Sequence, residues 1–186
     1  MLTTTDAIVL SLQPHSDKAH MLHAYTRAGG RVNYMVYGVG KKNSAEKYSP
    51  LSVVQLTTDD RSVRTAQLLF VPSTTNSDPY KRTIALFLAE VLYHVLRHPM
   101  PDEPMYEFIR LSVQALDQSE EPQNFHLAFL VGLAAKLGFE MENEIAVPHS
   151  RKERQEALQT LCEYFKEHVE TWQTPRSLDV LMEVFD

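Results

Sequence analysis

The sequence predicts an α+β fold in which a strand-rich first domain is followed by an all-helical second domain. Short β-branched and aromatic segments alternate with turn residues over the first 72 residues, and apolar residues recur at helical spacing from residue 84 onward. A stretch rich in Ser, Thr, Asn and Pro lies between them at 72–79 and is typical of a linker. We therefore predict two domains, residues 1–78 and 79–186.

Five short strands are predicted in the first domain. Turn signals separate them, such as the reversal Ala28-Gly29-Gly30 and the polar stretch at 58–62. Strands that recur about every ten residues favour a small barrel or sandwich. The predicted strands are 7–10, 21–26, 31–37, 51–57 and 63–71.

Five helices are predicted in the second domain. The first is strongly amphipathic and ends near Pro99, because the residue before a proline disfavours the helical conformation. The third is apolar nearly all round, which predicts the central buried helix of a bundle. The predicted helices are 84–96, 106–117, 125–137, 153–171 and 177–185.

The charge of the chain is unevenly distributed. The whole sequence of 186 residues has a formal net charge of -6, which disfavours nucleic-acid binding because counterion release needs clustered Lys and Arg. Residues 1–80 hold eight Lys and Arg against six Asp and Glu, whereas residues 81–186 hold ten against eighteen. The two parts therefore carry net charges of +2 and -8, and the argument against nucleic acid applies to the helical part alone.

Cys162 is the single cysteine of the sequence. One cysteine cannot form an intramolecular disulfide or supply a structural zinc site of two to four cysteines. The residues from Met1 to Asp6 contain no basic segment, and no stretch approaches the roughly 20 apolar residues of a membrane span. We expect a soluble, cytoplasmic protein that binds no metal.

Candidate catalytic motifs are incomplete. Gly40-Lys41 follows a predicted strand, but a phosphate-binding loop needs a glycine where Met35 stands and a Ser or Thr where Lys42 stands. There is no Gly-x-Ser-x-Gly nucleophile motif. A carboxylate and two imidazoles share a helical face without the spacing of a zinc protease, at Glu90, His94 and His98. We therefore predict that the protein is not an enzyme and needs no cofactor.

Cations and tyrosines are interleaved in the first domain. Cations follow phosphates and aromatic faces stack on bases, and single-strand-binding barrels combine the two. Because strand residues alternate between faces, Tyr34 and Tyr37 point to opposite sides, and one of them belongs to the core. In the alternative reading, about half of the tyrosines are core and the lysines are merely solvated. The predicted DNA-binding residues are Arg27, Arg31, Lys41, Lys42, Lys47, Tyr34 and Tyr37.

Short segments along nearly the whole chain follow a recognisable order. In the first domain they are Ala7-Ile8-Val9-Leu10, Asp17-Lys18-Ala19 and 30–44. In the second they are 84–92, 124–130, Leu137-Gly138-Phe139 and 164–181. Together they resemble the RecO family of bacterial DNA repair proteins, and the Bacteroidetes members in particular.

The resemblance implies an N-terminal OB-fold and a C-terminal helical domain. It implies a recombination mediator of the RecF pathway type, which binds single- and double-stranded DNA, anneals complementary strands and helps RecR to load the recombinase. The protein would then be cytoplasmic and associate with the nucleoid during repair. The acidic C-terminal tail of single-stranded DNA-binding protein would dock on the helical domain, and the candidate cations for it are Arg82, Arg110 and Lys136.

The sequence departs from the family in two respects. Many members carry a four-cysteine zinc module after the Leu-Gly-Phe segment, whereas Cys162 stands alone here. The chain is also shorter, and the missing part falls between Glu144 and Glu153. A rival hypothesis is a non-catalytic adaptor whose acidic helical domain is the working surface and attracts a basic partner.

Overall fold

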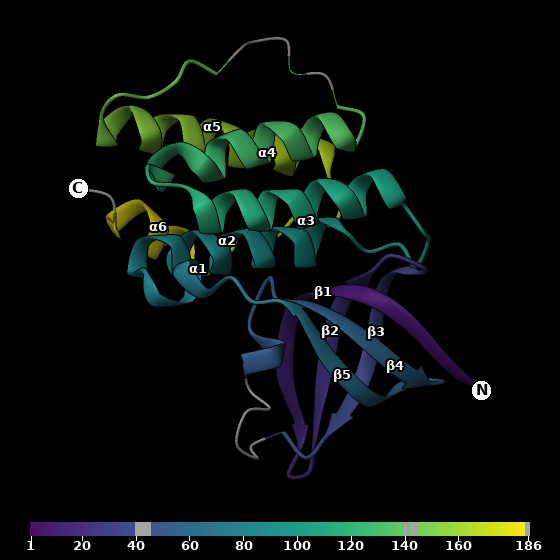
Figure 1. The fold of residues 1–186 in the computed structure, drawn as a ribbon. Helices are drawn as coiled ribbons and strands as arrows, with labels where there is room; N and C mark the ends of the chain where they lie inside the picture. The colour runs from purple at the N-terminus through teal and green to yellow at the C-terminus, as the bar shows by residue number, and fades with distance from the viewer. Residues whose placement is uncertain (40–45, 140, 142–144, 185–186) are drawn as a thin grey trace. The chain divides into compact units, whose positions relative to one another are not determined.

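The computed structural model describes residues 1–39, 46–139, 141 and 145–184 (Figure 1). It confirms the predicted α+β order, with a closed barrel of strands followed by a helical region. The chain forms two compact units, which we call the barrel unit and the helical unit. The barrel unit is Met1–Ser73 with Leu96–Val113, and the helical unit is Thr74–Val95 with Gln114–Asp186. The predicted division between residues 78 and 79 follows the chain, whereas these two units interleave.

Within the described residues, five strands form the barrel in the order β1-β2-β3-β5-β4. Every pair is antiparallel except β3 and β5, which run parallel and meet at Met35 and Ser62. Apolar side chains that alternate along the strands fill its interior, including Leu22, Tyr34 and Leu56. The strands are β1 (Leu2–Ser16), β2 (Ala19–Thr26), β3 (Gly30–Tyr37), β4 (Val53–Asp59) and β5 (Ser62–Phe70).

β1 is longer than its predicted apolar run at 7–10. Its first half pairs with β4 and its second half with β2, so both ends are held by ladders outside the apolar run. Thr3 Oγ1 lies 3.1 Å from Thr58 Oγ1 on β4. Polar side chains of this kind fit a half-exposed strand. Because the prediction relied on apolar residues, it did not include these polar parts of β1.

The strand predicted from residue 51 begins two residues later. Leu51 is buried with a φ of 64°, a left-handed conformation that interrupts an extended strand. Its N–H donates to the Val9 carbonyl at 2.8 Å, and the Val9 N–H donates to the Ser52 carbonyl at 2.9 Å. The short helix η1 (Glu46–Tyr48) precedes it and places the Tyr48 ring in the barrel core.

Residues Leu96–Val113 pack on the outside of the barrel and include the first part of α3 (Glu103–Gln118). We call Leu96–Val113 the covering segment. The N–H of Arg31 donates to the His98 carbonyl at 3.1 Å. Gly30 has a φ of 62°, and a Cβ built on it would lie 2.1 Å from the Met100 carbonyl oxygen. A glycine is therefore required where the covering segment crosses the end of β3.

The helical unit is built on α2, whose apolar face is fully buried at Phe87 and Leu92. The Phe87 ring meets the His126 ring of α4 edge-on at 6.3 Å. α4 is the predicted apolar helix, but Val131 is 38% exposed, so this helix is not buried on all sides. The helices are α1 (Ser73–Ser77), α2 (Pro79–Val95), η2 (Pro122–Asn124), α4 (Phe125–Lys136), α5 (Arg151–His168) and α6 (Leu178–Val184).

Hydrogen bonds to side chains account for the starts of two helices. The predicted linker contains α1, and the N–H of buried Thr75 in it donates to Asp117 Oδ1 at 2.7 Å. α5 begins at Arg151 because the Ser150 side chain accepts from the Glu153 N–H at 3.2 Å, while Glu153 Oε2 accepts from the His149 N–H at 2.8 Å. This reciprocal capping fixes the start of the helix.

Candidate nucleic-acid interface

Arg31, Tyr34 and Tyr37 are the predicted site residues on β3, and of these Arg31 and Tyr37 belong to the outer face of the strand. Tyr34 is 7% exposed in the barrel core, whereas Tyr37 is 62% exposed. The prediction that the two rings point to opposite sides is confirmed. Burial raises the pKa of the Tyr34 hydroxyl, against a hydrogen bond with Thr58 that lowers it. The Tyr34 ring is therefore core and cannot stack on a base, and Tyr37 is the exposed aromatic ring of the predicted pair.

The open part of this face is a short apolar platform with polar edges. Strand alternation places Asn33, Met35 and Tyr37 on the outside of β3. Met21 of β2 stands directly opposite Met35. We call these four residues the open face. Met21 and Met35 are half-buried, whereas Asn33 and Tyr37 are exposed.

Two exposed cations flank the open face. Lys18 precedes Ala19, which pairs with Tyr37. The Arg61 carbonyl accepts from the Met35 N–H at 2.7 Å, which brings Arg61 beside β3. Neither cation is among the predicted site residues, because both stand in turns whose position over β3 depends on strand register rather than on local pattern. The open face thus combines one aromatic ring, two thioethers and two neighbouring cations.

The other end of the outer face is closed by a polar cluster. His23 of β2 pairs with Asn33 of β3, and its Nδ1 lies 2.7 Å from the Asn33 Oδ1. Burial lowers the pKa of His23, a hydrogen bond with Asn33 raises it, and the nearby charges of Arg31 and Arg97 lower it further. The lowered pKa makes His23 neutral at pH 7.

Arg31 lies within this cluster and is only 8% exposed. Its Nη1 donates to the Leu96 carbonyl at 3.5 Å, and its Nε donates to Asn33 Oδ1 at 3.4 Å. The guanidinium is therefore buried beneath the covering segment. Arg31, a predicted phosphate contact, is instead directed at backbone and amide oxygens of its own unit.

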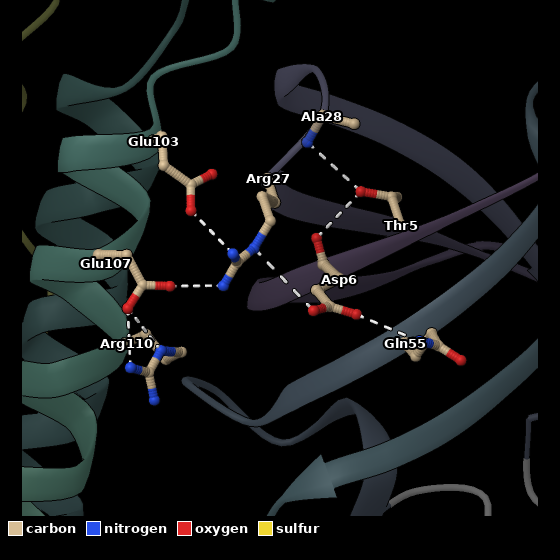
Figure 2. Close-up of polar contacts among 8 residues, drawn as sticks. All are labelled: Thr5, Asp6, Arg27, Ala28, Gln55, Glu103, Glu107 and Arg110. Atoms are coloured by element: carbon tan, nitrogen blue, oxygen red, sulfur yellow. Dashed lines mark hydrogen bonds and ion pairs between the residues drawn. The ribbon is translucent and has the colours of Figure 1, made fainter.

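Arg27 occupies the turn between β2 and β3 and is held by carboxylates (Figure 2). Its Nη1 donates to Glu103 Oε1 at 2.7 Å, and its Nη2 donates to Glu107 Oε1. The guanidinium also lies 4.7 Å from the centroid of the Tyr106 ring. Its Nε lies 4.0 Å from Asp6 Oδ2. Arg27 is therefore paired with α3 and β1 rather than presented to solvent alone.

Glu107 also binds a second arginine. Its Oε2 accepts from Arg110 Nη2 at 2.7 Å and from Arg110 Nε at 2.9 Å. The hydrogen bond from Arg110 is the largest cause that lowers the pKa of Glu107, and burial opposes it. Glu107 is thus a carboxylate shared between Arg27 and Arg110 at neutral pH.

The remaining predicted DNA-binding lysines have different positions. Lys47 is half-buried, and its Nζ donates to the Ala66 carbonyl of β5 at 3.0 Å. Lys41 and Lys42 lie outside the described residues. Their contact with DNA stays a prediction.

The helical unit contains a groove of about 290 Å³. Trp172 lines it and stacks on Phe165 at 5.3 Å between ring centroids. Burial and the neighbouring Glu163 raise the pKa of Cys162, which also lines the groove, to about 11. The groove is lined by Gln159, Cys162, Glu163, Lys166, Trp172, Thr174, Leu178 and Met182.

The predicted cations for a partner tail do not line this groove. Arg82 is exposed on α2, and Lys136 is exposed in the last turn of α4. Arg110 belongs to the barrel unit and binds Glu107. The cation on the groove is Lys166, which sequence reasoning missed because nothing in the local pattern distinguishes it from other surface lysines of α5.

The candidate metal triad is not assembled. Glu90 Oε2 accepts from the N–H and the hydroxyl of Ser177 at 2.9 and 2.6 Å, so this carboxylate holds the segment before α6. His94 and His98 fall in different units. Across the described residues no group of three or more His, Cys, Asp or Glu could hold a metal ion. In the same part of the chain, no helix has the length and apolarity needed to cross a membrane.

Comparisons with known proteins agree with the barrel and the helical region. Residues 1–69 match the family model of the Recombination protein O N terminal, and residues 76–144 match that of the Recombination protein O C terminal. DNA repair protein RecO of Porphyromonas gingivalis is 33% identical over 150 residues, which cover 74% of this chain and 61% of that protein.

Two further relatives align along their whole length. DNA repair protein RecO of Phocaeicola vulgatus is 28% identical over an alignment 240 positions long, and that of Bacteroides fragilis is 27% identical over one of 242 positions, with full coverage of both chains in each comparison. The two family models together span most of the sequence, in the order of the two structural regions. The chain belongs to the RecO family of DNA repair proteins.

Proposed function

We propose that this chain is a non-catalytic mediator of DNA repair and recombination that binds single-stranded DNA on the open face of its barrel. Membership of the RecO family supports a role in repair. The observation that carries the binding site is Tyr37, a ring that is 62% exposed on the strand face next to Lys18 and Arg61. Strands 2 and 3 of an OB barrel are the usual platform for oligonucleotides.

The chemistry of the open face suits a single strand without sequence preference. A base stacks on the Tyr37 ring, and the thioethers of Met21 and Met35 extend the apolar surface along β2 and β3. Lys18 and Arg61 then neutralise phosphates on either side. Only Asn33 and the hydroxyl of Tyr37 on the open face offer directional hydrogen bonds to a base edge, so binding is expected to depend on salt more than on sequence.

Binding of a labelled oligothymidine strand, measured by fluorescence anisotropy over a range of salt concentrations, tests this site. Tyr37→Ala removes one stack and is expected to weaken binding by roughly tenfold, since a base stack contributes about 1 to 3 kcal/mol. Tyr80→Ala is the matched control, because Tyr80 is 47% exposed on α2 in the helical unit. Equal losses for the two variants would contradict the proposed site.

We further propose that the chain also binds duplex DNA, anneals complementary strands, and works with RecR and the acidic tail of single-stranded DNA-binding protein in the cytoplasm, at the nucleoid. The groove of the helical unit is the candidate site for the tail, because it offers an apolar lining with Trp172 and the cation Lys166. Lys166→Ala is expected to weaken binding of a tail peptide, whereas Lys136→Ala should not. If Lys136→Ala alone weakened it, the tail would bind elsewhere.

The second candidate function is an adaptor that binds a basic protein through the helical unit. The observation in its favour is that this unit holds sixteen Asp and Glu against eight Lys and Arg, so its net charge is -8. Oligonucleotide binding at low salt distinguishes the two functions. The adaptor predicts no binding under any salt condition, whereas the mediator predicts binding that weakens steeply as salt increases.

A further inference from the structure

Arg27, in the turn between β2 and β3, already has anionic partners within the barrel unit. Arg27 receives two carboxylates from α3, through contacts of Nη1 with Glu103 at 2.7 Å and of Nη2 with Glu107. Figure 2 shows the two carboxylates side by side on α3, both facing the guanidinium. A phosphate would use the same two N–H groups, because a guanidinium binds carboxylates and phosphates with the same fork geometry.

Arg27 and the open face lie near opposite ends of β3, and the covering segment crosses the strand between them. The open face ends at Tyr37, and Arg27 stands beyond the opposite end of β3, where Thr26 pairs with Gly30. Tyr37 lies six positions after Arg31 on β3, which is about 20 Å of extended chain. A strand of nucleic acid that runs from Tyr37 toward Arg27 therefore passes over the covering segment on its path.

The covering segment is tightly packed at one point on this path, whereas its ion pairs with Arg27 can exchange with other anions. Near Gly30 the backbone of Met100 leaves no room for a Cβ, and buried Arg31 is bonded to its carbonyls, so this part is packed. The ion pairs that hold Arg27 are more exposed, since the side chains of Glu103, Arg27 and Glu107 are 54%, 39% and 31% exposed. Exposed ion pairs of this kind contribute little and exchange with competing ions.

We infer that Glu103 and Glu107 act as an internal substitute for nucleic-acid phosphate on Arg27, and so limit how tightly the barrel binds DNA. The inference rests on the proposed function, because it assigns a regulator to the same binding face. A phosphate that reaches Arg27 must displace the two carboxylates, and their negative charges also repel an approaching strand. Removing the two charges leaves Arg27 available as one additional phosphate contact.

The test is the double substitution Glu103→Gln/Glu107→Gln, with anisotropy of a labelled oligothymidine strand as the readout. We expect about fivefold tighter binding at low salt, the combined factor for no longer displacing the two exposed ion pairs of Arg27. The salt dependence should become steeper by about one phosphate contact. Asp60→Asn/Asp102→Asn is the matched control, since it removes two charges from the barrel unit and leaves both Arg27 partners in place.

A triple variant that adds Arg27→Gln separates Arg27 from Arg110, which Glu107→Gln also releases. The inference requires that the triple variant return to the salt slope of the unmodified protein. It is overturned if the double variant binds no more tightly than the control, or if the triple variant keeps the gain. The single variants Glu103→Gln and Glu107→Gln should each give a partial gain, and they serve as the test if the double variant does not fold.

The outcomes also separate this inference from the proposed function. If the unmodified protein binds DNA and the double variant binds equally, only the internal competition fails. If neither protein binds at low salt, the proposed function and the inference both fail. If Tyr37→Ala weakens binding and the double variant strengthens it, both stand.

Discussion

Lys81 Nζ donates a hydrogen bond of 2.8 Å to the backbone carbonyl of Asp117, at the last turn of α3. Lys81 is 4% exposed, so its ammonium group is buried in the helical unit against a helix C-terminus, where a positive charge is favourable. The neighbouring Asp117 carboxylate accepts from the Thr75 N–H at 2.7 Å. Asp117 therefore joins the starts of α1 and α2 to the end of α3 through both its backbone and its side chain.

Lys81→Met is expected to destabilise the protein by about 1 to 3 kcal/mol, because it leaves a buried carbonyl without its donor. Urea unfolding followed by circular dichroism measures the change. Arg82→Met is the matched control, since Arg82 follows Lys81 on α2 and is exposed. A loss no larger than that of Arg82→Met would show that the Lys81 bond contributes nothing to stability.

Gly30→Ala is expected to destabilise the barrel unit by well over about 2 kcal/mol. The left-handed backbone costs about 1 to 2 kcal/mol for a residue with a Cβ. In addition, the new methyl group would lie 2.1 Å from the Met100 carbonyl oxygen, so the covering segment must shift.

Gly38→Ala isolates the first of these costs. Gly38 has a φ of 70°, and no atom lies within 4 Å of the position of its Cβ. Its loss of stability should therefore stay near 1 to 2 kcal/mol, roughly the cost of the backbone alone. If thermal unfolding shows equal losses for Gly30→Ala and Gly38→Ala, the covering segment does not pack against Gly30 as described.

The features of the fold that could be predicted are those that the local sequence pattern determines. Alternation within Arg31 to Tyr37 correctly predicted that Tyr34 and Tyr37 face opposite sides, because a strand has a period of two residues. The helical spacing around Phe87 and Leu92 correctly predicted the apolar face of α2. In contrast, nothing local indicated that Leu96–Val113 packs with the barrel, because helical periodicity shows which face is apolar and not which surface covers it.

The candidate site was predictable only in part, for a related reason. A cation count along the chain cannot show which cations are already paired. Arg27 finds its carboxylates 76 and 80 residues later in the sequence, and Arg31 reaches a carbonyl 65 residues away. Lys18 comes beside Tyr37, and Arg61 beside Met35, only through strand register. The exposed aromatic ring was found by pattern, whereas its flanking cations required the tertiary structure.

Cys162 is expected to react slowly with alkylating reagents in the folded protein. Burial, followed by the charge of Glu163, raises the pKa of its thiol to about 11, so little thiolate is present at pH 8. Iodoacetamide labelling followed by mass spectrometry should be slow at pH 8 and should accelerate when urea unfolds the chain. Labelling as fast in the folded as in the unfolded protein would contradict this environment for the thiol.

Because His126 is buried, we expect the free energy of unfolding to decrease as the pH falls. Burial, and then the charge of Arg154, lowers the pKa of this imidazole to about 4 in the folded protein, against 6.5 as the ordinary value. Between these two pH values the unfolded chain binds a proton that the folded chain does not. Stability contributed by neutral His126 is therefore complete above about pH 6.5 and is lost as the pH falls toward 4, by about 3 kcal/mol in total.

The variant His126→Gln removes this titration. We expect the free energy of unfolding of the variant to fall less steeply between pH 6.5 and 4 than that of the unmodified protein. His149→Gln is the control, because His149 is an exposed histidine beside α5 in the same unit. Carboxylates titrate in the same range in the unmodified protein and in His126→Gln, so their contribution cancels in that comparison. Parallel profiles for the unmodified protein and His126→Gln would show that the imidazole is not held neutral by burial.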